Sequence, residues 1–371
     1  DGKQLWLVGW NGLVAISRDG GKHFGLVDIG TRDEPNSVRA RRGGDVLITT
    51  TGGDLYRSRD NGLHFQKVAS GVADLHKCMF AEQRTYAFCG GNDGTFYQYD
   101  LTTDSLHKMA LPASDVAFSG EVSVQAVRNF TIAMAGLSNE STQLYRSHNG
   151  GRTFVRAATL SEIGSRLWLG RDGKTVLVGT TRGDVYRSQR GGEDFSLVYD
   201  SPPGSQFLHD GVSSIGETDG GEFLVTLTHC QGILWNGNCA TNVLASTDSG
   251  ASFSLRAETL MKGDYPTAAD FGGMHHGVLL GPDVLVTDDD GKTFKSVVAE
   301  TLASSQTDVV GRELLTELAL VSPDSGYAIK ALVKQMGRGG YVDESVVHFD
   351  GKQHKLTTLY SLPRHGTFGE H

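Results

Sequence analysis

The octapeptide SRDGGKHF occupies residues 17–24, and a near copy, SRDNGLHF, occupies residues 58–65. Looser copies follow as SHNGGRTF (147–154), SQRGGEDF (188–195), STDSGASF (246–253) and TDDDGKTF (287–294). The closing phenylalanines are separated by 41 residues in three neighbouring pairs, Phe24–Phe65, Phe154–Phe195 and Phe253–Phe294. A fixed period of about 20–50 residues indicates a solenoid, a propeller or another array of small repeats.

Within one period the sequence is typical of short β-strands. Residues 38–68 contain four short runs rich in Val, Ile, Thr, Tyr and Phe, and Gly, Asp and Asn separate the runs. Such runs predict strands, and their separators predict tight turns. Four short strands in about 40–50 residues is the unit of a propeller blade. We therefore predict an all-β propeller of four-stranded antiparallel blades that forms a single domain over residues 1–371.

The octapeptide lies between the third and fourth strands of each period, where its chemistry favours a tight hairpin. Its glycine can adopt a positive φ, and its Asp and Ser or Thr can accept backbone N–H bonds across the turn. The closing Phe can pack between neighbouring sheets, a burial that contributes about 1.5–3 kcal/mol. The residues predicted to form these structural turns are Ser17, Asp19, Gly21, Phe24, Ser58, Asp60, Gly62, Phe65, Ser246, Asp248, Gly250, Phe253, Thr287, Asp289, Gly291 and Phe294.

Two copies depart from this pattern, because Asn149 and Arg190 stand where the others have Asp. We expect these two turns to be held differently. The departures also indicate that the acid is not kept at every copy for catalysis.

The pattern Ser-x-Asp-x-Gly-x-x-Phe resembles the Asp-box, also called the bacterial neuraminidase repeat. The segments LVGWNGLVAISRDGGKHF (7–24) and LLGPDVLVTDDDGKTF (279–294) are similar to the repeats of photosystem II assembly-factor-like propellers. Sortilin- and sialidase-type repeat proteins carry related boxes. The resemblance covers most of the chain and implies a propeller fold. The likeness to assembly factors also implies a scaffold or chaperone role.

Counting the copies predicts eight blades, with seven as the alternative. Two units lack a clear octapeptide but keep strand-like runs around degenerate turns. The predicted blades span residues 5–28, 37–69, 74–111, 121–158, 163–199, 212–257, 268–299 and 313–361. The first blade lacks an obvious innermost strand, because only Asp1 to Gln4 precede the run LWLVGW. Either that strand is missing, or a C-terminal segment supplies it and helps to close the ring.

Charge and cysteine content bound the function. The net charge is −9, from 34 basic and 43 acidic residues, which argues against nucleic-acid binding. We expect no membrane span, because no window approaches about 18 apolar residues. The N-terminus lacks the basic and then apolar layout of a signal peptide. Both a processed N-terminus and a cytosolic one would have this character.

Four cysteines form two local pairs, Cys78 with Cys89 and Cys230 with Cys239. Local pairing predicts two disulfides and a secreted, periplasmic or cell-surface location, whereas four free thiols remain the alternative. We expect no metal and no cofactor. The cysteine spacing is not that of a zinc knuckle, and the adjacent His275 and His276 would point to opposite sides of a strand.

One face of the predicted ring carries the longest loops, opposite the octapeptide turns. The long segments are 28–37, 199–212, 229–241, 258–268, 299–313 and 334–345. Long loops are commonly kept for binding, so we place the functional surface on this face. The candidate binding residues are Arg39, Arg41 and Arg42, which could bind an acidic peptide, a carboxylate or a phosphate, together with Trp235 and His209.

Catalysis is the alternative to binding. Sialidases need an Arg-Ile-Pro segment, and this sequence contains none. A pair of facing carboxylates could still hydrolyse a glycan, and Asp270, Glu313 and Glu317 are acids at loop edges. We favour a non-enzymatic secreted or periplasmic scaffold or assembly factor that binds a protein partner or a surface assembly through its loop-rich face. The alternative is a glycan-active or glycan-binding propeller of the glycoside hydrolase type.

Overall fold

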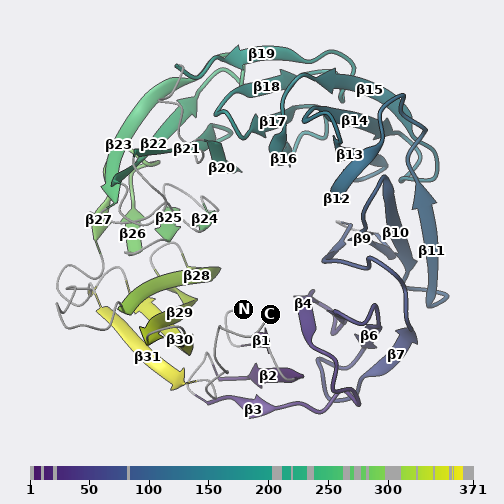
Figure 1. Ribbon diagram of the computed structural model, residues 1–371, viewed down its shortest axis with the longest axis vertical. Coiled ribbons are helices and arrows are strands. Elements are labelled where there is room, and N and C mark those ends of the chain that lie inside the picture. Colours follow the sequence, from purple (N-terminus) through teal and green to yellow (C-terminus); the bar gives the residue numbers. More distant parts are fainter. Residues whose placement is uncertain are drawn as a thin grey trace.

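A computed structural model describes residues 4–361, with the exception of 10–11, 20–22, 82–83, 203–210, 219, 232–237, 262–267, 271–276, 281–283, 297–310, 323–324, 337–338, 351–352 and 354. The described part is all-β, and its sheets stand side by side in a closed ring around a central opening (Figure 1). Every sheet is antiparallel and is built from consecutive strands. The predicted fold class is therefore confirmed.

Seven sheets have four strands, and the sheet at the N-terminus has three. The three-stranded sheet contains β1 (Leu5–Gly9), β2 (Leu13–Ser17) and β3 (Gly25–Leu26). The next four sheets contain β4 (Pro35–Ala40), β5 (Val46–Thr50), β6 (Leu55–Ser58) and β7 (Gln66–Ala69); β8 (Cys78–Phe80), β9 (Tyr86–Gly90), β10 (Thr95–Asp100) and β11 (Ser105–Ala110); β12 (Phe118–Val127), β13 (Phe130–Leu137), β14 (Thr142–Ser147) and β15 (Val155–Leu160); and β16 (Gly164–Leu169), β17 (Val176–Thr180), β18 (Val185–Ser188) and β19 (Ser196–Tyr199). The last three contain β20 (Gly211–Glu217), β21 (Phe223–Gln231), β22 (Asn238–Ser246) and β23 (Ser254–Met261); β24 (Ala268–Asp270), β25 (Gly277–Leu280), β26 (Val284–Thr287) and β27 (Lys295–Ser296); and β28 (Gly311–Ser322), β29 (Ser325–Met336), β30 (Gly339–Asp350) and β31 (Lys355–Ser361).

The prediction of eight four-stranded blades is slightly wrong, because the described residues form seven four-stranded sheets, the number given by the alternative, beside one three-stranded sheet. In the complete sheets the first strand lies nearest the opening and the fourth forms the outer wall (Figure 1). The octapeptide at 17–24 joins β2 to β3, so these strands match the third and fourth strands of a complete sheet. Among the described residues, the strand that this sheet lacks is therefore the innermost one. The alternative that the C-terminal segment supplies it falls on residues 362–371, outside the described residues.

The absence of a fourth strand among the described residues changes the burial of β1. Its side chains Leu5 to Val8 are only partly buried. Every residue of β5, which holds the same position in the next sheet, is buried. The two strands are similarly apolar, so composition does not explain the difference. In the described sheets β4 pairs with the inner edge of β5, whereas β1 is itself the innermost described strand.

The octapeptide turns are held by a repeated set of hydrogen bonds. In the turn at 58–65, the backbone N–H of Gly62 donates to Ser58 Oγ at 2.8 Å. Ser58 Oγ donates in turn to Asp60 Oδ1 at 2.8 Å, and the N–H groups of Leu63 and His64 donate to the same oxygen at 3.0 Å each. Gly62 has a φ of 78°, a conformation that a Cβ disfavours. The residue types of the octapeptide are thus those that the turn requires.

The two turns that lack the Asp are held in different ways. Asn149 Oδ1 accepts from Ser147 Oγ and from the N–H groups of Arg152 and Thr153, which are the bonds that Asp60 makes. The expectation that Asn149 holds its turn differently is wrong, because an amide oxygen accepts as a carboxylate does. Arg190 cannot accept, and its guanidinium instead forms an ion pair with Asp194 across the turn.

The core consists of apolar clusters between neighbouring sheets. One cluster joins Leu47 and Leu55 of the second sheet to Ala87 and Tyr99 of the third. The octapeptide phenylalanines also pack across sheet boundaries, and Phe65 meets the Trp6 ring of the first sheet edge-on at 5.8 Å. The second sheet therefore packs against the first sheet through one of its faces and against the third sheet through the other.

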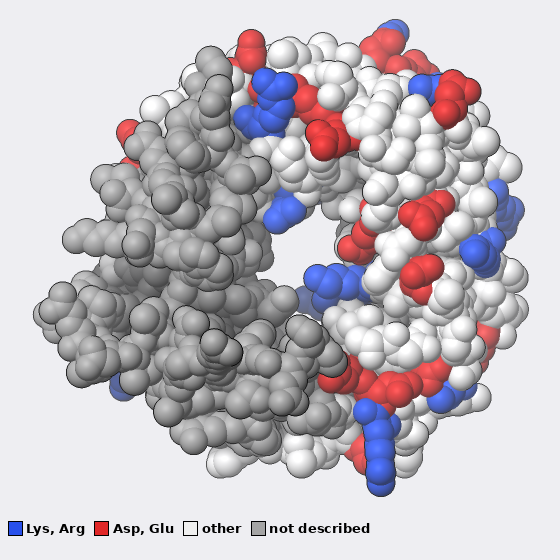
Figure 2. Space-filling view, in the orientation of Figure 1, with Lys and Arg blue, Asp and Glu red and all other residues white. Residues whose placement is uncertain are grey.

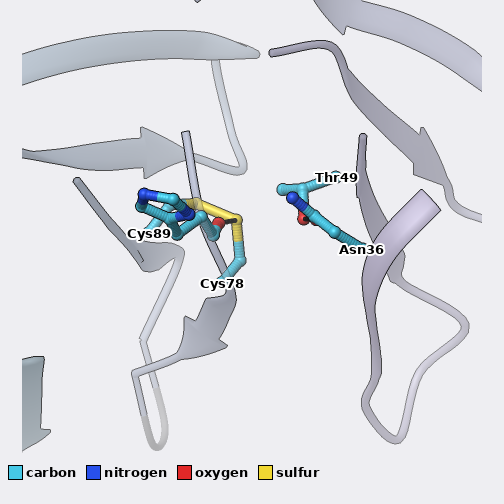
Figure 3. The surroundings of a disulfide bond; sticks show 5 residues. Asn36, Thr49, Cys78 and Cys89 are labelled. Carbon is cyan, nitrogen blue, oxygen red and sulfur yellow. Dashed lines mark hydrogen bonds between the residues drawn. A yellow bond between two sulfur atoms is a disulfide. The ribbon is translucent and has the colours of Figure 1, made fainter. Parts of the chain in front are cut away.

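One predicted disulfide, Cys78–Cys89, is present and buried. It links β8 to β9 within one sheet, and Asn36 and Thr49 of the neighbouring sheet lie beside it (Figure 3). The backbone register also places Cys230 of β21 opposite Cys239 of β22. The side chains of that second pair lie outside the described part, so their disulfide stays a prediction.

Candidate functional site

The innermost strands of the complete sheets surround the central opening (Figure 1). Exposed side chains on these strands therefore lie at the opening or at its rims. The described wall consists of β4, β8, β12, β16 and β20. Figure 2 shows basic and acidic side chains at the edge of the opening. The exposed residues of charged or apolar character on this wall are Arg39, Ala40, Met79, Glu121 and Arg166.

Arg166 lies on β16 and bridges two sheets. Its Nε donates to the carbonyl oxygen of Ser213 on β20 at 2.7 Å, and Nη1 donates to the carbonyl oxygen of Ser165 at 2.7 Å. The side chain is exposed in the opening, but the protein around it limits hydration and lowers the pKa of Arg166. The sequence analysis did not select Arg166, because one arginine in an apolar strand carries no motif.

The predicted cluster of Arg39, Arg41 and Arg42 divides between two places. Arg39 is exposed on β4, and its Nη1 donates to the carbonyl oxygen of Val38 at 2.9 Å. Arg41 and Arg42 lie in the turn between β4 and β5, which bonds to the octapeptide turn through the N–H of Asn61 and the carbonyl of Gly44. Both therefore lie on the face opposite to the one expected.

Arg41 has a structural partner in this turn. Its Nη2 lies 2.6 Å from Asp45 Oδ2, its Nη1 donates to the carbonyl oxygen of Arg84, and its guanidinium stacks over the Phe80 ring. Arg42 is exposed. Of the predicted cluster, only Arg39 is placed on the wall of the opening.

Two of the three Tyr-Arg-Ser arginines join neighbouring sheets, a role that the sequence analysis missed. Arg57 Nη1 reaches Asp104 Oδ1 of the next sheet at 2.6 Å. Arg146 Nη1 reaches Glu193 Oε1 of the next sheet at 2.7 Å. The recurrence of Arg between Tyr and Ser, one residue before the octapeptide begins, was the available signal.

Two buried acids meet on the loop-rich face, where Glu162 precedes β16 and Asp184 precedes β18. Asp184 Oδ1 accepts from the N–H of Ser201 at 2.7 Å. Burial and a hydrogen bond with Asp184 raise the pKa of Glu162. Two carboxyl groups within hydrogen-bond distance are too close for a glycosidase pair, which needs about 5–10 Å.

We expect Glu162→Gln to stabilise the protein at high pH. The folded state holds the Glu162 proton to a higher pH than the unfolded chain, so this group costs stability as pH rises from 4.5 through its raised pKa. Removing the charge should raise the free energy of unfolding by on the order of 1 kcal/mol at pH 8 and should leave it unchanged at pH 4. Melting temperatures at pH 4, 6 and 8 measure this. Exposed Glu258→Gln is the control, and an unchanged pH dependence in Glu162→Gln would contradict the assignment.

Several predicted residues fall outside the described part of the chain. Trp235, His209, His275 and His276 are among the residues not described. Asp270, Glu313 and Glu317 lie on strands whose side chains there are not described. Within the described residues, no three His, Cys, Asp or Glu side chains gather to hold a metal ion. That part of the chain also contains no helix with the length and apolar character needed to cross a membrane.

Comparison with known proteins extends the fold assignment. No protein-family model and no curated protein sequence matches the chain. Among solved structures, the C-terminal WD40 domain of Sif2 is similar with a TM-score of 0.60 and 11% identity, over 93% of this chain and 92% of that one. This likeness supports the propeller fold.

Two further solved structures are similar at lower scores. YCF48 bound to D1 peptide has a TM-score of 0.45 and 13% identity, over 94% of this chain and 89% of that one. The GH74 xyloglucanase from Xanthomonas campestris has a TM-score of 0.41 and 12% identity, over 96% of this chain and 76% of that one.

Proposed function

We propose that the protein is a non-catalytic scaffold that binds a protein partner at its central opening and on the loop-rich face around it. One observation carries the proposal: the successive innermost strands β4, β8, β12 and β16 carry the exposed side chains Arg39, Met79, Glu121 and Arg166. The wall thus presents basic, apolar and acidic groups in turn. Protein surfaces combine these three kinds of group, and Met and Arg are enriched where proteins bind one another.

The acids of the octapeptide turns are unsuited to catalysis. Hydrogen bonds from His64 and Ser58 hold the pKa of Asp60 well below its usual range, and bonds from Ser246 and Ser252 do the same for Asp248. A general acid or base works best when its pKa lies near the operating pH. These carboxylates therefore act as fixed acceptors in the fold, which supports a binding role over a hydrolytic one.

We also propose that the protein works in an oxidising compartment, outside the cell or in the periplasm. The buried Cys78–Cys89 disulfide supports this location, because such bonds persist where thiols are not kept reduced.

Site-specific photo-crosslinking tests the scaffold proposal. A photoreactive phenylalanine analogue replaces Met79, whose side chain is 42% exposed on β8, or Leu26, which is 73% exposed on the outer strand β3. In extract from the native source, we expect position 79 to give one discrete protein adduct that position 26 does not give. The adduct should form again with the purified partner, and an excess of unmodified protein should suppress it.

Two outcomes would overturn the proposal. Identical adducts at positions 79 and 26 would show non-specific contact. An oligosaccharide adduct at position 79, without protein, would favour the glycan-binding alternative.

A further inference from the structure

Arg166 has hydrogen-bond capacity that the protein does not use. Its bonds to Ser213 and Ser165 hold the guanidinium between β16 and β20. A guanidinium has five N–H donors, and these two bonds use only Nε and Nη1. The remaining donors meet no acceptor within the part of the chain that the structure describes. Among the described residues, Arg166 is therefore fixed in place with donors left for a ligand.

The charge of Arg166 also lacks a partner among the described residues. The loss of hydration disfavours its cation, and no carboxylate offsets this effect. An arginine in such surroundings gains from a bound anion, since opposite charge favours the ionised form. A site that is exposed to the opening but poorly hydrated strengthens such an ion pair relative to one on the outer surface.

Other arginines show both outcomes, because buried Arg187 also forms no ion pair among the described residues and burial lowers its pKa too. Four arginines that are less exposed each form an ion pair with a carboxylate: Arg41, Arg57, Arg146 and Arg256. The chain has 43 acidic residues against 34 basic ones, so carboxylates are plentiful. Arg39 and Arg166 nevertheless remain without one in the described structure, and both lie on innermost strands. On the innermost strands whose side chains are described, neither arginine is therefore paired with a carboxylate.

We infer that Arg166, assisted by Arg39, binds a carboxylate carried by an extended acidic segment of the partner. The inference rests on the proposed function, in which the partner is a protein. A carboxylate suits the planar fork of a guanidinium, because two parallel N–H···O bonds can form. Two sheets lie between β16 and β4 in chain order, so an extended segment suits both residues better than a small anion does.

Binding of a fluorescein-labelled hexaglutamate peptide tests this inference, by fluorescence anisotropy at low salt, where charge screening is weak. We expect hexaglutamate to bind and hexaglutamine not to bind. Arg166→Gln should weaken binding about tenfold, and Arg166→Lys should recover only part of it, because an ammonium lacks the fork. Arg39→Gln should weaken binding about threefold.

Arg152→Gln is the matched control, because Arg152 is exposed in an octapeptide turn and the substitution removes the same charge. Equal melting temperatures for the variants exclude a folding defect. Equal affinities of Arg166→Gln and Arg152→Gln, or no binding of hexaglutamate to the wild type, would overturn the inference. Binding of inorganic phosphate at Arg166 without hexaglutamate binding would also overturn it. A photo-crosslink at position 79 that persists undiminished in Arg166→Gln would refute this inference and leave the scaffold proposal intact.

Discussion

Replacing Gly62 with alanine should lower the free energy of unfolding by about 2–5 kcal/mol. Gly62 has a φ of 78°, and a left-handed conformation costs a residue with a Cβ about 1–2 kcal/mol. The added Cβ would also lie 1.9 Å from Cη2 of Trp6, which packs over the turn from the first sheet. Relieving such overpacking costs about 1–3 kcal/mol more. Urea unfolding of the variant and the wild type measures the sum.

Gly71→Ala separates the two causes. Gly71 has a φ of 61°, but a Cβ there meets nothing within 4 Å. This variant should show the conformational cost alone, about 1–2 kcal/mol. Equal losses in the two variants would show that Trp6 does not pack against Gly62 as described.

Replacing Arg57 with alanine should destabilise the protein by about 3–5 kcal/mol, because it removes one partner from a buried ionic cluster. The Arg57 side chain is 6% exposed, and its Nη2 lies 2.6 Å from Asp45 Oδ1 within its own sheet. Its Nη1 donates to the carbonyl oxygen of Leu101 and to Asp104 Oδ1, both of the next sheet. The loss leaves these acceptors under-satisfied at a sheet boundary. The shift in the urea midpoint gives the magnitude.

Arg59→Ala is the companion variant, because Arg59 pairs with the same Asp104 but is 48% exposed. An exposed ion pair contributes about 0–1 kcal/mol, so this loss should be small. Similar effects of the two substitutions would contradict a special role for the buried guanidinium.

The fold could be predicted because the octapeptide encodes its own turn. Residues such as Asp60 and Gly62 bond within eight positions, so local sequence sufficed to place the hairpins and their period. The blade count was off because the octapeptide marks only the third and fourth strands of a sheet, and the first sheet has three strands among the described residues.

The candidate site could not be predicted in the same way, because its features depend on contacts between sheets. Arg41 and Arg39 look alike in the sequence, yet the fold brings Asp45 to Arg41 and leaves Arg39 on the wall. Arg166 gains its position from Ser213, a residue 47 positions away on another sheet. Local patterns do not report such neighbours, so cation clusters in a propeller have to be judged from the folded ring.

The disulfide has a consequence for how the ring is held closed. Cys78 and Cys89 belong to adjacent strands of the same sheet, and the Cys230–Cys239 register would join strands of one sheet as well. Neither pair spans the boundary between two sheets. Within the described residues, neighbouring sheets are joined by the chain and by noncovalent contacts. We therefore expect a reductant to loosen the β8–β9 sheet without opening the ring.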